Sequence, residues 1–284
     1  MKNILILSIV ALLLLGCGKK QTETSATSNV QSTGSGEMKS AGESNSESPD
    51  SLKYEIRKFH KTYRGCNDNE ENCSYMKIEY PVFTSGKSYK RINEAIYAYL
   101  TDSVYMVEEG MSNKTLEKLA ENYFKDYETM KKDNPDWGLS YAFESAGRVL
   151  YNKGNVVTVE INTYAFTGGA HPNSYNVYFV FDIETGNRLR VQDIFVKGFE
   201  SGLNKLIEKK YREFRGISDK ERLDGENGML FENHIEFNDN FGLLKDGVIF
   251  YYNSYEIAAY AVGPTELNFT YKELGDLLKP EYKK

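Results

Sequence analysis

The side chains best suited to acid–base or nucleophilic chemistry are thinly spread along this chain. Its three histidines, His60, His171 and His234, lie far apart in sequence and in dissimilar settings. A nucleophilic serine needs a neighbouring base and an exposed turn. The nearest string, Gly138-Leu-Ser140-Tyr-Ala142, lacks the closing glycine of such a turn and runs into a strand-like segment. The sequence therefore predicts no catalytic residue and no cofactor.

One histidine does lie in a loop suited to recognition. His171 ends a glycine-containing loop between two strand-like runs, and four tyrosines gather around an Asn-Ser turn much later in the chain. Tyrosine combines an apolar ring with a hydroxyl group, which suits sugar stacking and protein interfaces. Packing in the core is the alternative interpretation for any single ring. The predicted ligand-binding residues are Thr167, Gly168, Gly169, Ala170, His171, Tyr251, Tyr252, Tyr255 and Tyr260.

Acidic residues leave two further chemistries open. Glycoside hydrolysis needs two carboxylates at a set distance in space, which requires no particular spacing in sequence. Asp224, Glu226 and Glu232 lie near two glycines and carry the oxygen ligands that calcium prefers. Their order is not that of an EF-hand, and a solvated acidic loop explains them more simply. We predict no metal site.

The first cysteine belongs to an export signal. Lys2 precedes an apolar run over residues 4–15, and small residues lead up to Cys17. This pattern predicts a signal peptide over residues 1–16, since the apolar run is too short to cross about 30 Å of hydrocarbon. It also resembles a bacterial lipobox, in which the thiol of Cys17 would be lipidated. We expect an exported protein whose partner is a membrane, through the lipid on Cys17.

The other two cysteines predict a covalent bond. Cys66 and Cys73 flank a polar loop between two alternating segments. An exported compartment permits a disulfide, and these two remain once Cys17 is lipidated. A metal-binding pair is the alternative, but the spacing is not Cys-x-x-Cys and no histidine lies close in sequence.

Composition divides the chain and limits its partners. Residues 17–51 are rich in Ser, Thr, Gly and Glu and contain no aromatic residue, which predicts a disordered tether. The formal net charge is −6, which argues against nucleic-acid binding.

Hydrophobic periodicity predicts an α+β fold with mainly antiparallel sheets and packed helices, and the length from residue 52 onwards is enough for one large domain or two small subdomains. We expect the helix over 199–214 to cover the sheet formed by the runs 156–166 and 175–181. The expected strands are 54–59, 76–80, 139–151, 156–166, 175–181, 241–244, 248–252 and 265–269, and the expected helices are 92–100, 116–130, 199–214 and a short one begun by the capping box Thr270-Tyr-Lys-Glu273.

Three sets of segments carry a family resemblance. They are Ile78-Glu-Tyr-Pro-Val-Phe83 with Arg91-Ile-Asn-Glu-Ala-Ile96, Tyr164-Ala-Phe-Thr-Gly-Gly-Ala-His171 with Phe181-Asp-Ile-Glu-Thr-Gly186, and Tyr255-Glu-Ile-Ala-Ala-Tyr-Ala-Val-Gly-Pro264 with 271–278. In order and spacing they resemble the paired bacterial domains of unknown function numbered 4163 and 3298. The resemblance implies that 52–155 is 4163-like and 156–284 is 3298-like.

The resemblance also implies a function. The domain pair occurs in an anti-sigma factor that acts as a lysozyme receptor and beside the catalytic domain of some peptidoglycan deacetylases. It implies a non-catalytic envelope module that recognises a lysozyme-type muramidase or a peptidoglycan glycan, with 255–263 as the counterpart of the lysozyme-contacting region. A glycan hydrolase with paired carboxylates and a structural lipoprotein without a ligand remain alternatives.

Overall fold

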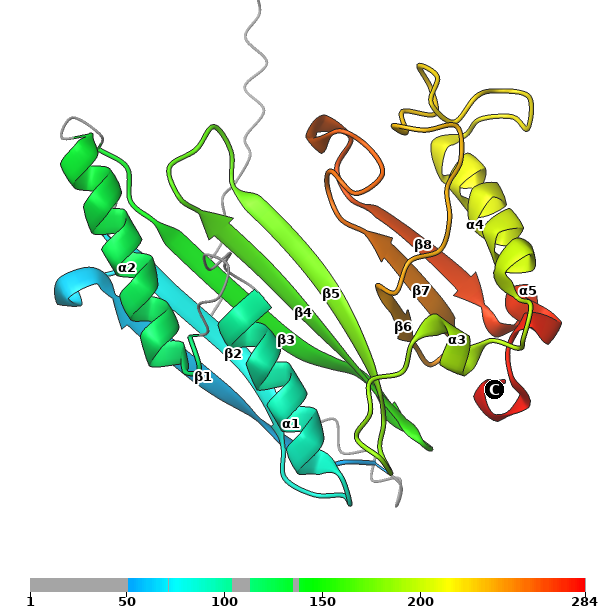
Figure 1. Cartoon of the computed structure of the whole chain (residues 1–284), viewed down its shortest axis with the longest axis horizontal. Coiled ribbons are helices and arrows are strands. Elements are labelled where there is room, and N and C mark those ends of the chain that lie inside the picture. Colours follow the sequence, from blue (N-terminus) through cyan, green and yellow to red (C-terminus); the bar gives the residue numbers. More distant parts are fainter. Residues whose placement is uncertain (1–50, 71, 104–112, 135–137, 284) are drawn as a thin grey trace, which may run out of the picture. The chain divides into compact units, whose positions relative to one another are not determined.

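Two sheets organise the folded part of the chain (Figure 1). The computed structural model describes residues 51–70, 72–103, 113–134 and 138–283, all of which belong to one compact unit, Ser46–Lys284. The predicted signal peptide, the lipidation site Cys17 and nearly all of the predicted tether lie outside the described residues. Within the described residues, no helix has both the length and the apolar character needed to cross a bilayer.

The larger sheet has five strands in the order β1-β2-β3-β4-β5. All neighbouring pairs are antiparallel except β2 and β3, which run parallel. Parallel neighbours need a crossover connection, and here two helices supply it: α1 (Tyr89–Ala98) and α2 (Leu116–Asp133). The strands are β1 (Tyr54–Thr62), β2 (Tyr75–Phe83), β3 (Ala142–Lys153), β4 (Val156–Phe166) and β5 (Asn173–Asp182).

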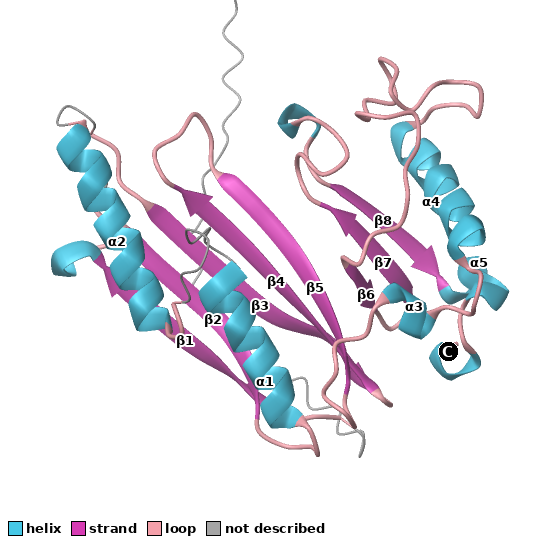
Figure 2. Ribbon diagram, viewed as in Figure 1, coloured by secondary structure: helices cyan, strands magenta, loops and turns pink. Residues whose placement is uncertain are grey.

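Helices α1 and α2 cover one face of this sheet (Figure 2). The alternation along β4 points Val157, Val159 and Ile161 to that face, where they pack in one cluster with the stripe of α1 and α2. The expectation that the helix over 199–214 covers these residues is therefore wrong. Its stripe packs on the smaller sheet instead, because any helix with one apolar stripe can cover either sheet and periodicity does not choose between them.

The smaller sheet has three antiparallel strands in the order β6-β7-β8. One of its faces packs on α4 (Glu200–Arg215), which forms the second core cluster together with the short helices. The capping box predicted at Thr270 begins α5, as expected. The remaining elements are α3 (Val191–Ile194), β6 (Phe241–Leu243), β7 (Gly247–Tyr252), β8 (Thr265–Thr270) and α5 (Tyr271–Leu274).

Gly242 lets the other face of the smaller sheet approach β4 and β5. A Cβ atom at this position would lie 2.9 Å from the Tyr178 ring and 3.1 Å from a methyl group of Thr158. The Thr158 hydroxyl also donates to the carbonyl of Leu243 at 2.7 Å. The two sheets therefore meet in a close contact that only glycine permits at residue 242.

The predicted fold class is confirmed: the chain is α+β with two mainly antiparallel sheets. The disulfide between Cys66 and Cys73 is also confirmed, and it closes the loop that joins β1 to β2. The expected division between residues 155 and 156 falls in the turn between β3 and β4, which pair along nearly their whole length.

Candidate functional site

Two segments more than 80 residues apart meet at the start of β5. The ring of His171, from the β4–β5 loop, stacks on the ring of Tyr260 with centroids 3.7 Å apart and planes 16° apart. Tyr255 completes the group, 5.5 Å from Tyr260 and 6.4 Å from His171 between centroids. We call these three residues the His171 cluster. It joins the two stretches that the sequence singled out for recognition.

Hydrogen bonds fix the orientation of the His171 ring. The carbonyl oxygen of Pro172 accepts from the Tyr260 hydroxyl at 2.9 Å and lies 3.1 Å from His171 Nδ1. A carbonyl can only accept, so Nδ1 carries the proton of this contact and Nε2 of the neutral ring is an acceptor. The Tyr255 hydroxyl lies 3.5 Å from Nε2, which is long for a hydrogen bond. Nε2 therefore keeps the capacity to accept from a ligand.

The backbone presents Tyr255 to solvent in an uncommon conformation. Its φ is +69°, in the left-handed region that side chains other than glycine seldom adopt, and the residue is 56% exposed. The turn that holds it begins at Asn253, whose N–H donates to the Glu256 carboxylate at 2.8 Å, and the Tyr255 N–H donates to the Ala258 carbonyl. Strained backbone of this kind is retained where the surroundings enforce it, often at functional sites.

Two asparagine side chains position the cluster by bonding to the outer edge of β5. Asn253 Oδ1 accepts from the Asn176 N–H at 2.8 Å and Asn253 Nδ2 donates to the Asn176 carbonyl at 3.2 Å. Asn240 Nδ2 donates to the same carbonyl, and Asn240 Oδ1 accepts from the Tyr178 N–H at 2.9 Å. These amides satisfy backbone groups that an edge strand would otherwise leave unpaired. Asn253 thereby holds the loop after β7 beside β5, and Asn240 holds the start of β6 there.

The rest of the predicted binding set divides into accessible and inaccessible residues. Thr167 and Gly168 are partly exposed, and Gly169 and Ala170 are exposed. Tyr251 is half-buried, with its ring centroid 6.0 Å from that of Tyr178.

The prediction that Tyr252 contacts a ligand is wrong, because the residue is only 1% exposed and its hydroxyl donates to the Glu236 carbonyl at 2.7 Å. Alternation along β7 points Val248, Phe250 and Tyr252 into the same core.

One carboxylate lies buried between the sheets. Glu160 accepts from the Asn176 side chain at 2.9 Å and the Tyr178 hydroxyl at 3.1 Å, and its second oxygen lies 2.6 Å from Arg148. Burial and the adjacent Glu160 charge raise the pKa of Tyr178 above its usual range. In the described part of the chain Glu160 is the only buried carboxylate. The hydrolase alternative needs two facing carboxylates, and the buried residues described here supply one.

The other polar residues singled out in the sequence have nearby partners. Asp224 pairs with Arg222 through both oxygens, and the hydrogen bond from Arg222 holds the pKa of Asp224 below its usual value. His60 lies 3.2 Å from Asp68, and His234 lies 3.3 Å from Glu232. Within the described residues no three acidic, histidine or cysteine side chains come together as a metal site.

Comparison with protein families assigns the two halves of the fold separately. Residues 67–174 match the family described as Deacetylase PdaC, and residues 192–272 match the Protein of unknown function family DUF3298. His171 lies in the first segment, whereas Tyr255 and Tyr260 lie in the second. The His171 cluster therefore forms where the two family-matched segments meet.

Similarity to a curated protein is partial. The chain is 25% identical over 138 residues to the Peptidoglycan-N-acetylmuramic acid deacetylase PdaC of Bacillus subtilis. The match covers 48% of this chain and spans only 29% of that relative's length.

Solved structures share the fold over most of the chain. A DUF3298 family protein from Bacteroides fragilis aligns with a TM-score of 0.62 and 21% identity, covering 81% of this chain and 94% of that protein. Another from Pseudomonas aeruginosa aligns with a TM-score of 0.60 and 21% identity, covering 82% and 97%. At this identity the likeness shows the fold.

Sequence reasoning missed the residues that bring the cluster together. In the sequence, Asn240 and Asn253 look like ordinary loop asparagines, and no spacing pattern links them to β5. Their only signal is the concentration of asparagine beside strand ends, which is equally typical of turns.

Proposed function

We propose that this protein is a non-catalytic binding module of the bacterial envelope, and that the His171 cluster binds a peptidoglycan-type glycan. The observation that carries the proposal is the meeting of His171, Tyr255 and Tyr260 at one exposed point, from loops far apart in sequence. The proposal includes export and attachment to a membrane through lipid on Cys17.

The chemistry of the cluster suits a sugar ring. Aromatic rings offer an apolar face for the C–H groups of a pyranose, and the exposed Tyr255 is the most accessible of the three. Nε2 of His171 can accept from a sugar hydroxyl or from the N–H of an acetamido group. Stacking and one acceptor together recognise a ring and its orientation without any reaction.

The comparisons support the choice of glycan. A relative of this chain is named as a deacetylase of peptidoglycan N-acetylmuramic acid, and the matched region covers less than a third of it. We infer that the shared region contributes recognition of the same class of polymer. The resemblance of this segment to the domain numbered 4163 remains part of the proposal.

The test compares retention on purified peptidoglycan for the full chain and for three single variants, His171→Ala, Tyr255→Ala and Tyr260→Ala. Tyr54→Ala is the matched control, because Tyr54 is 43% exposed on β1, at the opposite edge of the five-stranded sheet. We expect Tyr255→Ala to weaken binding about tenfold, as loss of an aromatic anchor does, and Tyr54→Ala to bind like the wild type.

Two results would overturn the glycan proposal. One is no retention of the wild type, and the other is equal retention of Tyr255→Ala and Tyr54→Ala. Immobilised hen-type lysozyme is the parallel arm. Retention there, with none on peptidoglycan, would assign the cluster to a protein partner instead.

A further inference from the structure

Cationic side chains gather at the end of the larger sheet where the predicted tether joins the folded chain. Four segments meet there: the residues before β1, the turn from β2 into α1, the β3–β4 turn and the turn after β5 (Figure 1). We call residues 51–53, 84–91, 152–155 and 182–187 the basic end. Its charged residues are Lys53, Lys87, Lys90, Arg91, Lys153, Asp182 and Glu184. Five cations against two carboxylates make this end positive in a chain whose net charge is −6.

Hydrogen bonds join the four segments into one surface. The Leu52 N–H donates to Asn152 Oδ1 at 2.9 Å, and Asn152 Nδ2 donates back to the Leu52 carbonyl at 2.8 Å. The other links run from the Lys53 N–H to the Ser85 hydroxyl, from the Ser88 hydroxyl to the Glu184 carbonyl and from the Ile183 N–H to the Asn155 carbonyl. The cations therefore stay together, and the chain enters the fold among them.

Most of these cations have no acidic partner. Among the residues that the structure describes, only Lys87 of the five pairs with a carboxylate, that of Glu184 at 3.4 Å. The two side chains of this pair are 74% and 60% exposed, and ion pairs so exposed contribute little. The positive charge of the basic end is therefore left to attract an anionic partner.

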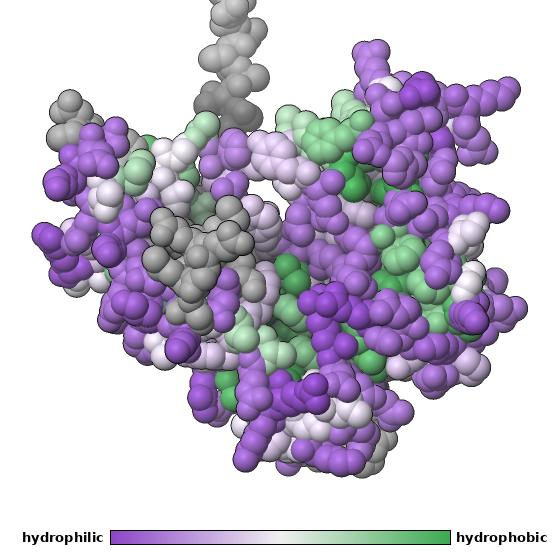
Figure 3. All heavy atoms as spheres, in the orientation of Figure 1, coloured by the Kyte–Doolittle hydropathy of each residue, from purple (hydrophilic) through white to green (hydrophobic). Residues whose placement is uncertain are grey.

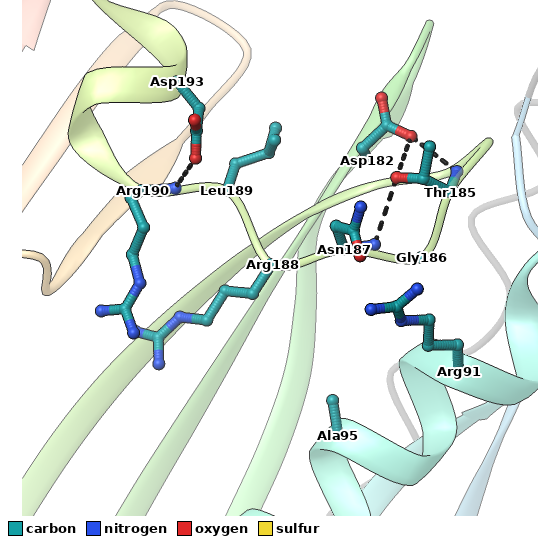
Figure 4. Close-up of a pocket in the computed structure, with 10 residues that line it drawn as sticks. All are labelled: Arg91, Ala95, Asp182, Thr185, Gly186, Asn187, Arg188, Leu189, Arg190 and Asp193. Carbon is teal, nitrogen blue, oxygen red and sulfur yellow. Dashed lines mark hydrogen bonds between the residues drawn. The ribbon is translucent and has the colours of Figure 1, made fainter.

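Figure 4 shows which arginine belongs to this surface. Arg91 projects from the first turn of α1 beside the turn after β5, where Asp182 already accepts two hydrogen bonds. Arg188 extends away from Arg91 and ends beside Arg190, which pairs with Asp239. The basic end is therefore a spread of separate charges, and its cations do not converge on a single point.

The surface is exposed and includes an aromatic ring at its border. All five cations are exposed, and Tyr54, which follows Lys53, is 43% exposed. Hydrophilic residues predominate at the lower end of the view in Figure 3, where these segments lie. Tyrosine is enriched at membrane–water interfaces, because its ring and hydroxyl suit the headgroup level. Spread cations with such a ring at their border suit a broad charged surface.

We propose that the basic end docks on the anionic lipid headgroups of the membrane that holds the chain. The inference rests on the proposed attachment through Cys17, which lies 34 positions before residue 51. A flexible tether of this length has an end-to-end distance of about 30 Å, so it keeps the basic end at a high effective concentration beside the membrane. Each lysine or arginine close to an anionic leaflet strengthens association about fivefold.

Docking would orient the proposed binding site. Strand β5 runs from the loop of the His171 cluster to the turn at the basic end, and its ten residues span roughly 30 Å. With the basic end on the membrane, the His171 cluster faces away from the lipid and towards the polymers of the envelope. The two surfaces share no residue, so either can fail alone.

The test maps lysine reactivity on the full chain reconstituted in phosphatidylcholine vesicles with and without phosphatidylglycerol. Exposed lysines are acetylated, and mass spectrometry gives the rate at each one. We expect phosphatidylglycerol to slow the lysines of the basic end at least fivefold, and high salt to abolish the effect. Lys132, exposed in the last turn of α2, should react equally on both kinds of vesicle, because α2 leads to the start of β3 and the basic end lies where β3 ends.

Matched substitutions test the charge itself. Lys153→Gln and Lys132→Gln each remove one exposed lysine. On phosphatidylglycerol vesicles, Lys153→Gln should lower the ratio of docked to undocked chain about fivefold, measured as faster acetylation of Lys87. Lys132→Gln should leave the acetylation of Lys87 unchanged.

Three results would overturn docking: equal acetylation on the two kinds of vesicle, equal effects of the two substitutions, or protection of Lys132 as strong as that of Lys87. Flotation of the same vesicles measures attachment separately. A chain that floats on both kinds without selective protection loses only the docking surface. A chain that fails to float on phosphatidylcholine loses the proposed attachment, and selective protection on phosphatidylglycerol would still support docking.

Discussion

The bond between Asn253 and the edge of β5 gives the sharpest prediction. Asn253→Ala removes two hydrogen bonds to the backbone of Asn176, a residue only 5% exposed. The Asn176 N–H loses its partner, which costs about 1–3 kcal/mol for a buried donor, and the second bond contributes about 1 kcal/mol. Because Asn240 still donates to the Asn176 carbonyl, we expect a total loss of about 2–3 kcal/mol.

Thermal unfolding followed by circular dichroism measures this loss. For a folded region of this size, 1 kcal/mol lowers Tm by about 2–4 °C, so Tm should fall by roughly 4–12 °C. The matched control is Asn162→Ala, an exposed asparagine on β4 opposite Asn176, which should change stability by about 0.5 kcal/mol or less. The ring proton shifts of His171 should also change, because Asn253 holds the Tyr260 loop in place.

Equal Tm values for Asn253→Ala and the Asn162→Ala control would refute the reasoning. It would mean that water satisfies the β5 edge as well as the amide does, and that the two loops meet without this bond. A lower Tm with unchanged His171 shifts would separate the two claims: the bond would stabilise the fold but not position the cluster.

Three further predictions concern stability. Gly242→Ala should cost about 1–3 kcal/mol, seen in thermal melts, because its Cβ would overlap the Tyr178 ring. The hydrogen bond from Lys210 lowers the pKa of Glu273 to about 2, from 4.5; this stabilisation is present above pH 4.5 and is lost as pH falls towards 2, so Tm of wild type and Glu273→Gln should converge over that range. Reduction of the disulfide should cost about 2.5 kcal/mol by the loop-entropy argument, and an unchanged Tm in reductant would contradict it.

Local patterns in the sequence predicted most of the elements. Alternation in 156–166 and 175–181 identified two paired strands and their apolar face, which α1 and α2 cover, because side chains along a strand point to opposite sides. It did not show that the polar face of 156–161 is buried too, where the smaller sheet packs on it. The stripe over 116–130 identified α2, and the capping box at Thr270 identified the start of α5. These features depend on neighbours within a few residues, which the sequence displays directly.

Long-range arrangement could not be predicted in the same way. The apolar stripe of α4 suits either sheet, and nothing in its residues selects the smaller one. The parallel pairing of β2 with β3 depends on where two helices carry the chain, not on the strands themselves. Tyr252 illustrates another limit: the clustering of tyrosines suggested a surface, whereas the structure points Tyr252 into the core with Val248 and Phe250, and the all-apolar sequence of β7 does not distinguish its two faces.

The sequence predicted which residues form the candidate site, but not which contacts bring them together. The sequence identified His171, Tyr255 and Tyr260, whose chemistry is visible from their side chains. Their contact depends on Asn240 and Asn253, whose side chains replace a missing strand at the edge of β5. Side-chain bonds to a backbone edge carry no periodic signal, so only the structure shows them.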